Sequence, residues 1–372
     1  MDELHVAYQV TPTLGHLLQQ WDSQIADEPS IARRRFTDIG LWPAARSATI
    51  AGSTGIEGNP LTAVQVDQVL AGAPIDARPS DVREVLNYND ALELANAAAH
   101  RESFEWTQEL LRRLNATVMN GLEDDERGEY RHEPVGVGGV YSPPDYGRLP
   151  SLMSELVEWL RAEEPCHPLI RAGLTHLNVV SIHPWLNGNG RTARVAGSLM
   201  MMRCGLGAPE LLNVESAIRA DTSRYAQVLQ VTHGPTYDPE RHAATEWLEY
   251  FAELCVGRLE LRNRLDAAVG GDVGMLTMEL PGPPSVERLL ILLGARLAPI
   301  RVSTIAGPLG LSTARVRAIV APLAADGWLI ALGERRGRRY EAGPRLLDLP
   351  LRTPDLMDRF RIGTDDEEDG AS

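Results

Sequence analysis

The segment 182–194, with the sequence IHPWLNGNGRTAR, constrains the fold more than any other part of the chain. A helical pattern over 167–182 ends at His183-Pro184, and a new helical pattern begins within residues 189–191. Proline cannot continue the first helix, and the two glycines between the helices permit a tight turn. The segment therefore predicts two helices that are joined by a short glycine-rich loop.

The loop offers several groups that bind phosphate. Successive backbone N–H groups of Gly188, Asn189 and Gly190 would form a concave nest, and the N-terminus of the second helix adds partial positive charge. Arg191 and Arg194 are three residues apart and should project from roughly the same helix face. Their guanidinium groups could chelate terminal phosphate oxygens through paired hydrogen bonds, so a di- or triphosphate fits better than a single phosphate.

His183 lies directly before this turn, where a neutral imidazole could take a proton from a hydroxyl that attacks phosphorus. The alternative is that the turn only connects two helices and that His183 is a hydrogen-bonded residue at a helix end. The combination of a histidine, the sequence GNGR and a second arginine at fixed offsets favours the phosphate site.

Residues 183–194 resemble the motif HxFx(D/E)GNGRxxR of the Fic (Fido) family. The resemblance implies a mainly α fold with a Fic-type helical core. It also implies transfer of a nucleotide monophosphate, most often AMP from ATP, to a Ser, Thr or Tyr hydroxyl of a protein. His183 would be the general base, residues 188–190 the anion hole, and Arg191 and Arg194 the clamp on the β- and γ-phosphates.

The sequence departs from this motif at two positions. Trp185 replaces the usual Phe and keeps a large aromatic side chain there. Asn187 replaces the acidic residue that holds the phosphate-bound Mg²⁺ in the family, and a neutral amide oxygen is a poorer ligand for a hard dication. Outside the motif, Tyr225 is a candidate for contact with the nucleotide base, and the alternative is a tyrosine packed on a helix face.

Upstream, the segment 53–59, STGIEGN, is similar to the family's inhibitory motif (S/T)xxxE(G/N). Ser53 and Glu57 are four residues apart and should share one face of a helix at about 45–58. A bidentate pair between Glu57 and Arg194 would occupy the arginine that a γ-phosphate requires, which predicts autoinhibition. The alternatives are a solvated glutamate at a helix end and, by the same resemblance, a glutamate that activates water to remove AMP.

The stretch 128–150 is rich in glycine and proline, and residues 135–141 within it predict a short β-hairpin flap between helices. Such a flap could pair with an extended segment of a target protein and present its hydroxyl to His183. The alternative is a passive surface hairpin.

Residues 285–345 resemble a winged helix-turn-helix domain. Helical patterns over 286–293, 302–306 and 313–325, the last with Ser312 as N-cap, precede a strand and the basic tip ERRGRR. Such domains place one helix in the major groove of duplex DNA and contact phosphates with the wing. The arginines that we expect to contact nucleic acid are Arg315, Arg317, Arg335, Arg336, Arg338 and Arg339. The alternative is a domain used for protein contacts or for formation of a homodimer.

Charge is distributed unevenly along this chain of 372 residues and net charge −15. The segment 285–345 carries ten arginines and four acidic residues, whereas the acidic run 365–369 predicts a disordered tail. No run of 18 apolar residues could span a bilayer and the N-terminus lacks the pattern of a signal peptide, so we expect a cytoplasmic protein without membrane contact. The three widely spaced cysteines suit reduced thiols.

These patterns together predict five regions. They are an N-terminal helical region (1–110), the Fic core (111–265), a linker (266–284), the winged helix-turn-helix domain (285–345) and a tail (346–372). The predicted function is an autoinhibited Fic protein that binds ATP, with Mg²⁺ in question, and transfers AMP to an unidentified target protein. The alternatives are a nucleotide-sensing transcriptional regulator with weak or no transferase activity, and an enzyme that removes AMP.

Overall fold

The computed structural model describes residues 3–25, 42–122, 127–162, 166–206, 209–281, 285–297, 299–306, 309–333 and 338–362. Nearly all regular structure in these ranges is helical, with one two-stranded antiparallel sheet, β1–β2. The predicted mainly α fold is therefore confirmed.

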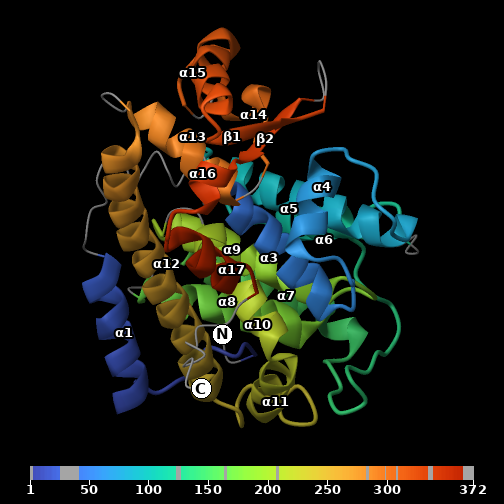
Figure 1. Ribbon diagram of the computed structural model, residues 1–372. Coiled ribbons are helices and arrows are strands. Elements are labelled where there is room, and N and C mark those ends of the chain that lie inside the picture. Colours follow the sequence, from blue (N-terminus) through green and yellow to red (C-terminus); the bar gives the residue numbers. More distant parts are fainter. Residues whose placement is uncertain are drawn as a thin grey trace.

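Two helices, α8 (Pro168–Ile182) and α9 (Asn189–Arg203), lie at the centre of the molecule and pack against each other (Figure 1). Every residue of α8 after Pro168 is buried, as is nearly every residue of α9. A helix with apolar or small residues on all sides can be covered on all sides by other helices. The loop between α8 and α9 is thus held rigidly from both ends.

Further helices surround this central pair. They are α1 (Pro12–Ile25), α3 (Trp42–Ile56), α4 (Ala63–Leu70), α5 (Pro79–Ala99), α6 (Gln108–Val118), α7 (Leu149–Arg161), α10 (Val214–Ala220) and α11 (Thr222–His233). Two short 3₁₀ turns, η2 (Tyr146–Arg148) and η3 (Pro209–Leu211), connect neighbouring segments. Both α5 and α6 pack against α9, and α3 packs against α10 and α5. This arrangement brings α3, α5 and α6 to the loop that precedes α9.

The long helix α12 (Thr245–Glu279) corrects the predicted domain boundaries. The linker expected at 266–284 is helical up to the end of α12. Leu265, Val269 and Leu276 recur at helical spacing and pack in the core of the C-terminal unit. Their burial outweighs the low helix propensity of the glycines among them, so the helix continues to the proline-rich stretch.

The C-terminal unit contains α13 (Val286–Leu297), α14 (Val302–Ala306), α15 (Thr313–Ala325), β1 (Leu329–Leu332) and β2 (Arg339–Ala342). The predicted N-cap of α15 is confirmed, because Ser312 Oγ accepts a hydrogen bond of 3.2 Å from the backbone N–H of Arg315. β1 and β2 pair antiparallel, and Ile300 forms an additional bridge with Tyr340. The predicted basic tip spans 334–339; its residues 334–337 lie outside the described residues, and Arg339 begins β2.

The region 346–372 was predicted as a tail that is disordered at its acidic end. Its first part is helical and packs on the core, so the description as a tail is corrected for residues up to 362. The chain forms α16 (Pro344–Leu347) and α17 (Thr353–Ile362), and α17 packs against α12 and α3 (Figure 1). Met357, on α17, is fully buried in the C-terminal core. This apolar anchor is the reason that the segment folds back. The acidic run 365–369 lies outside the described residues.

The flap segment 135–141 forms a turn that is closed by a single antiparallel bridge between Val137 and Tyr141, without a ladder of strands. The Tyr141 hydroxyl is buried and donates a hydrogen bond of 2.7 Å to the carbonyl oxygen of Ser181, on α8. Val140 is exposed at the tip. The segment is therefore fastened to the central helix at one end and exposed at the other.

Helix α3 takes part in both hydrophobic cores. Ala44 and Ala45 near its start pack in the C-terminal core, whereas Ile50 and Ala51 pack in the main core around α8 and α9. The helix ends near the predicted position, and Gly58 follows it with φ of 95°, a backbone conformation that favours glycine.

Two expectations drawn from composition can be compared with the structure. All three cysteines are free, as predicted. In the ranges that the structure describes, no helix combines the length and the apolar character that crossing a bilayer requires.

We predict that Asp272→Ala releases α17 from α12. The Asp272 carboxylate accepts hydrogen bonds from the backbone N–H groups of Arg352 (3.0 Å) and Thr353 (2.9 Å). Because such charge-assisted bonds contribute about 1.5–3 kcal/mol each, loss of both should lower the free energy of unfolding by about 3 kcal/mol or more. Amide exchange of residues 353–362 should accelerate. Glu279→Ala, at an exposed position of the same helix, should change neither quantity, and unaltered exchange in the Asp272 variant would contradict the assignment.

Candidate functional site

His183 ends α8 in a left-handed backbone conformation with φ of 51°, which is uncommon outside glycine. Its ring Nδ1 lies 3.2 Å from the carbonyl oxygen of Val180. A carbonyl only accepts hydrogen bonds, so Nδ1 carries the hydrogen and Nε2 keeps a lone pair. The ring is thus fixed in the tautomer that can accept a proton at Nε2.

Burial is the main reason that the pKa of His183 falls to about 4. The charge of Arg131 acts in the same direction, whereas the hydrogen bond to Val180 and the charge of Glu57 partly offset the decrease. The imidazole is therefore neutral at pH 7, the form that a general base requires. Arg131 also donates from Nε to the His183 carbonyl oxygen at 2.9 Å. Arg131 lies in the glycine- and proline-rich stretch 128–150, where no motif marks it as a site residue.

The glycine turn between α8 and α9 is held from behind by α6. Gly188 adopts φ of 76°, and a Cβ atom at this position would lie 2.8 Å from the Met119 sulfur. Asn115 donates from Nδ2 to the backbone oxygen of Asn187 at 2.9 Å. Both the backbone conformation and the close contact require glycine here.

The side chain of Asn189 shapes the turn from inside. It is buried, its Oδ1 accepts from the backbone N–H of Trp185 (3.0 Å), and its Nδ2 donates to the Trp185 carbonyl oxygen (2.8 Å). A contact of Asn189 with a nucleotide would therefore come from its backbone N–H. The Trp185 ring fills the core at 1% exposure, consistent with the expected role of a large aromatic residue.

Helix α3 holds the guanidinium group of Arg194. Nε donates to Ser53 Oγ (2.7 Å), while Nη2 donates to the Ser53 carbonyl oxygen (3.1 Å) and to Glu57 Oε1 (2.8 Å). The Arg194 side chain is 2% exposed and that of Glu57 is 32% exposed. The expected pairing of Glu57 with Arg194 is present. The pair is not bidentate as expected. Glu57 accepts only from Nη2, because Nε of Arg194 donates to Ser53 Oγ instead.

The Glu57 carboxylate lies directly over the glycine turn. A Cβ atom added to Gly190 would come within 2.6 Å of Glu57 Oε1, so this approach needs a residue without a side chain. Burial alone would raise the pKa of Glu57, but the charge and hydrogen bond of Arg194, with the charges of Arg191 and His183, hold it below its usual value. An anionic carboxylate thus lies at the predicted phosphate nest.

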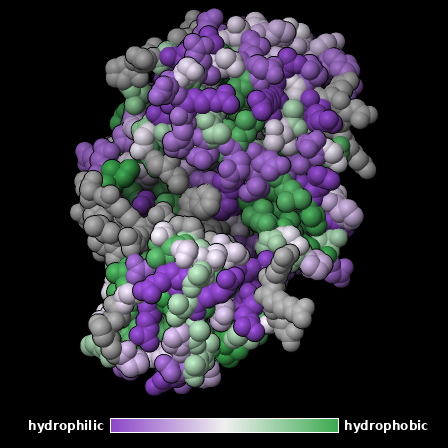
Figure 2. All heavy atoms as spheres, turned by 90° about the horizontal axis from the view of Figure 1, so that it is seen from above, coloured by the Kyte–Doolittle hydropathy of each residue, from purple (hydrophilic) through white to green (hydrophobic). Residues whose placement is uncertain are grey.

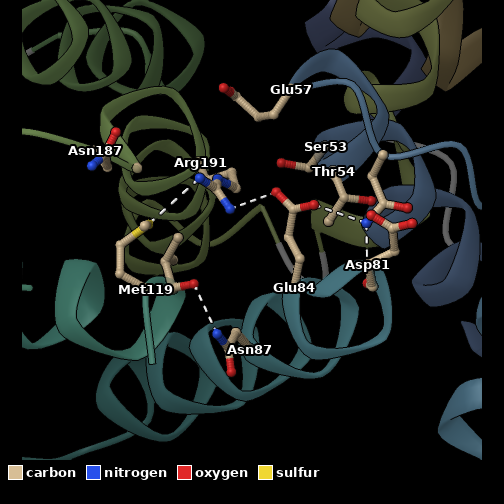
Figure 3. A network of polar contacts seen from close by, with 12 residues as sticks. Ser53, Thr54, Glu57, Asp81, Glu84, Asn87, Met119, Asn187 and Arg191 are labelled. Atoms are coloured by element: carbon tan, nitrogen blue, oxygen red, sulfur yellow. Dashed lines mark hydrogen bonds and ion pairs between the residues drawn. The ribbon is translucent and has the colours of Figure 1, made fainter. Parts of the chain in front are cut away.

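Arg191 is bound by a carboxylate that the sequence analysis did not single out. Its Nη1 lies 2.5 Å from Oε1 of Glu84, on α5 (Figure 3). The two arginines that were expected to share one ligand are therefore paired with two different carboxylates, Glu57 directly after α3 and Glu84 on α5. Glu84 belongs to no motif, and nothing in the local sequence distinguishes it from the other acidic residues of α5.

Tyr225 is buried on α11, and its hydroxyl lies 3.0 Å from Nε2 of His176. Its ring also contacts those of Trp247 and Tyr250. This environment agrees with the alternative of a packed tyrosine. The predicted contact of Tyr225 with a nucleotide base stays a prediction.

Asn187 is exposed on the loop. Within the ranges that the structure describes, no group of three or more His, Cys, Asp or Glu side chains is arranged to hold a metal ion.

The residues predicted to contact nucleic acid lie on the C-terminal unit. Arg315 and Arg317 are exposed on α15, and Arg338 and Arg339 are exposed where β2 begins. Arg335 and Arg336 lie outside the described residues. The exposed arginines thus belong to a unit other than the one that holds His183.

Solved structures show the same fold. A Fic family protein from Desulfovibrio desulfuricans G20 is similar with a TM-score of 0.62 and 24% sequence identity, over 91% of this chain and 98% of that one. A Fic domain containing signaling protein from Bacteroides thetaiotaomicron VPI-5482 has a TM-score of 0.55 and 25% identity, over 68% and 98% of the two chains.

Sequence relatives point to the same region. The protein adenylyltransferase Fic of Culex quinquefasciatus is 35% identical over 176 residues, which cover 45% of this chain and 35% of that relative. The protein of the same name from Drosophila mojavensis is 35% identical over 157 residues, covering 41% and 31%. The chain thus spans about a third of the length of these relatives. A sequence model of the Fic/DOC family matches residues 105–201, which include the loop with His183 and both arginines. Residues 105–201 of this chain therefore form a domain of the Fic/DOC family.

Proposed function

We propose that this protein binds ATP and transfers AMP to a hydroxyl group of a target protein, and that Glu57 inhibits the transfer by occupying Arg194. The observation that carries the proposal is the glycine turn with a neutral histidine at one side and the Glu57 carboxylate over it. An anion-binding turn beside a base suits attack of a hydroxyl on phosphorus. The name adenylyltransferase, borne by relatives that share this region, supports the same reaction.

The reaction would proceed by attack of the target hydroxyl oxygen on the α-phosphorus of ATP. The hydroxyl proton passes to Nε2 of His183 as the new P–O bond forms. The bond between the α-phosphorus and the oxygen that bridges to the β-phosphate breaks, and pyrophosphate leaves with the electron pair. His183 then releases the proton to solvent. The backbone N–H groups of residues 188–190 and the two arginines would hold the phosphate oxygens.

Inhibition follows from competition between two anions for Arg194. The buried guanidinium needs an anionic partner, and the Glu57 carboxylate supplies one in the resting protein. A γ-phosphate that approaches Arg194 and Gly190 must displace this carboxylate first. Since Glu57 is a third exposed and lies just beyond the last residue of α3, its side chain can leave without unfolding the helix.

A metal ion enters no step of this proposal. The family resemblance suggests Mg²⁺ on the phosphates, but Asn187 offers an amide oxygen where a carboxylate would suit a hard cation. The arginines are the cationic groups that this chain itself supplies for the phosphates. The same site could also serve removal of AMP: a water molecule activated by Glu57 would attack the AMP phosphorus, break its bond to the target oxygen, and release AMP and the free hydroxyl.

We predict that Glu57→Gly activates the protein. With labelled ATP, this variant should label protein at least about tenfold more than the wild type, because one charge-assisted hydrogen bond contributes about 1.5–3 kcal/mol. Calorimetry should show ATP uptake by the same variant. His183→Ala in the Glu57→Gly background is the matched control, and it should bind ATP but add no label. Lack of ATP and ADP uptake by the Glu57→Gly variant would refute the proposal.

We also predict an unusual pH profile. His183 acts as a base only when it is neutral, which holds above its pKa of about 4. Loss of Glu57, whose charge raises that pKa, cannot move it upward. The transfer rate of the Glu57→Gly variant should therefore stay level from pH 8 to about pH 5 and fall only towards pH 4, with circular dichroism as a control for unfolding. An acidic limb centred near the ordinary histidine value of about 6.5 would contradict this assignment.

A second candidate function is a DNA-binding regulator in which the Fic/DOC domain senses nucleotide. It is favoured by the winged-helix order of elements in the C-terminal unit and by the exposed arginines on α15 and β2. The face of the molecule seen from above in Figure 2, at the end formed by this unit, is largely hydrophilic. A helix and hairpin with exposed arginines suit contacts with DNA phosphates.

We predict that the double variant Arg315→Ala, Arg317→Ala weakens binding to duplex DNA and lowers its salt dependence. The slope of log affinity against log salt should decrease by about one for each phosphate contact that is lost. Arg241→Ala, at a highly exposed arginine of the main body, should leave the slope unchanged. If a protein shortened by residues 363–372 binds no duplex DNA at low salt, the second candidate function is wrong.

A further inference from the structure

The ion pair between Arg191 and Glu84 is nearly enclosed. The two side chains are 9% and 14% exposed. Both carboxylate oxygens of Glu84 have partners, since Oε1 contacts Arg191 and Oε2 accepts from Asn59 Nδ2 at 2.8 Å. Figure 3 shows Glu84 reaching from α5 to the guanidinium group of Arg191. Glu84 is therefore fixed at both oxygens.

Arg191 has donors that Glu84 does not use. Its Nη2 lies 3.5 Å from the Met119 sulfur, a weak acceptor, and its Nε is buried without a hydrogen-bond partner among the described residues. Arg194 differs, because Ser53 and Glu57 take both its Nε and its Nη2. Arg191 is thus anchored at one nitrogen while its other donors are left for a further acceptor. A buried donor without a partner is costly, so an anion that reaches it gains affinity.

The two carboxylates at the arginines differ in how easily they can leave. Glu57 follows the last residue of α3, is a third exposed and precedes Gly58 with its positive φ. Glu84 lies inside α5, a helix of 21 residues, and is fastened by Asn59. An incoming phosphate can therefore displace Glu57 far more easily than Glu84.

We propose that Glu84 is a positioning residue that holds Arg191 in place for the nucleotide phosphates, while Glu57 is the carboxylate that leaves. This inference rests on the proposed function and adds a second, opposite role for a glutamate at the same site. With Glu84 in place, departure of Glu57 exposes the charge of Arg194 and leaves Arg191 oriented. Without Glu84, Arg191 would lose its anchor and would have to be ordered by the nucleotide, which reduces affinity.

Asn59 fastens the turn that follows Glu57 to Glu84 and so limits what must move. Its Nδ2 donates to Glu84 Oε2 and to the Asp81 carbonyl oxygen (3.1 Å), and its Oδ1 accepts from the backbone N–H of Leu61 (3.1 Å). The turn after α3 is thereby fastened to α5 only two residues beyond Glu57. The Glu57 side chain can consequently move away from Arg194, with Gly58 as the flexible position, while the contacts of Asn59 with Glu84 and of Glu84 with Arg191 are kept.

Calorimetry with ATP and with adenosine tests the inference in the Glu57→Gly background. Adding Glu84→Gln should weaken ATP binding by about tenfold or more, because a charge-assisted anchor is lost. Adenosine binding should not change, since adenosine lacks the phosphates that Arg191 would hold. A purely structural role of Glu84 would instead weaken both ligands alike. Glu93→Gln is the matched control, as Glu93 lies on the same helix and pairs with Arg46 at 2.8 Å.

Asn59→Ala in the same background provides a second variant that keeps both charges of the ion pair. It should weaken ATP binding by a smaller factor and leave adenosine binding unchanged. ATP binding that is unchanged or tighter in the Glu84→Gln variant would overturn the inference, as would an equal loss for ATP and adenosine. If the Glu57→Gly parent itself takes up no ATP, the proposed function and this inference both fail, whereas the other outcomes overturn the inference alone.

Discussion

The hydrogen-bonded ion pair between Arg194 and Glu57 determines what the site can accept. Arg194 is 2% exposed, and a buried guanidinium without an anion would be strongly destabilising. The arginine therefore always requires a partner, and the question is which anion supplies it. Because Glu57 Oε1 also lies over the bare backbone of Gly190, one carboxylate covers both the cation and the glycine turn. Under the proposed function, ligand entry at this place would be an exchange of anions, and the affinity of a nucleotide would include the cost of displacing Glu57.

The helix that presents this carboxylate connects two parts of the molecule. The start of α3 packs in the C-terminal core through Ala44 and Ala45, and its later residues Ile50 and Ala51 pack in the main core. The long helix α12 also contributes to both cores, and α17 packs against α3 as well as α12. Burial in two cores restrains the axis of α3, so the freedom needed to release Arg194 is concentrated at the end of the helix. A change in the packing of the C-terminal unit around Ala44 and Ala45 would shift α3 and thereby Ser53, which contacts Arg194.

The sequence was most informative where function depends on a few adjacent residues. From the segment 182–194 we could predict the two helices, the turn between them and the place of His183 beside it. This was possible because the backbone of the turn adopts a conformation that favours glycine. The pairing of Glu57 with Arg194 was predicted from a second short motif. By contrast, Glu84 meets Arg191 only after α5 has packed beside α9, and no local pattern encodes that contact. The boundaries of the predicted linker and tail were wrong for a related reason. Helices α12 and α17 are stabilised by burial between the two units, and the glycines of α12 and the polar residues of α17 obscure their helical patterns in the sequence.

Under the proposed function, this arrangement would separate inhibition from the chemical step. His183 is neutral because of burial and the charge of Arg131, and neither depends on the position of Glu57. Removal of Glu57 would withdraw a charge that favours the protonated ring, so the base would remain neutral while Arg194 becomes available. If inhibition acted through His183 instead, it would have to change the protonation of that ring. Displacement of Glu57 would then alter both nucleotide binding and the basicity of His183. Because the carboxylate acts on the arginine instead, access of the phosphates can change by a large factor while the base stays in its active form throughout.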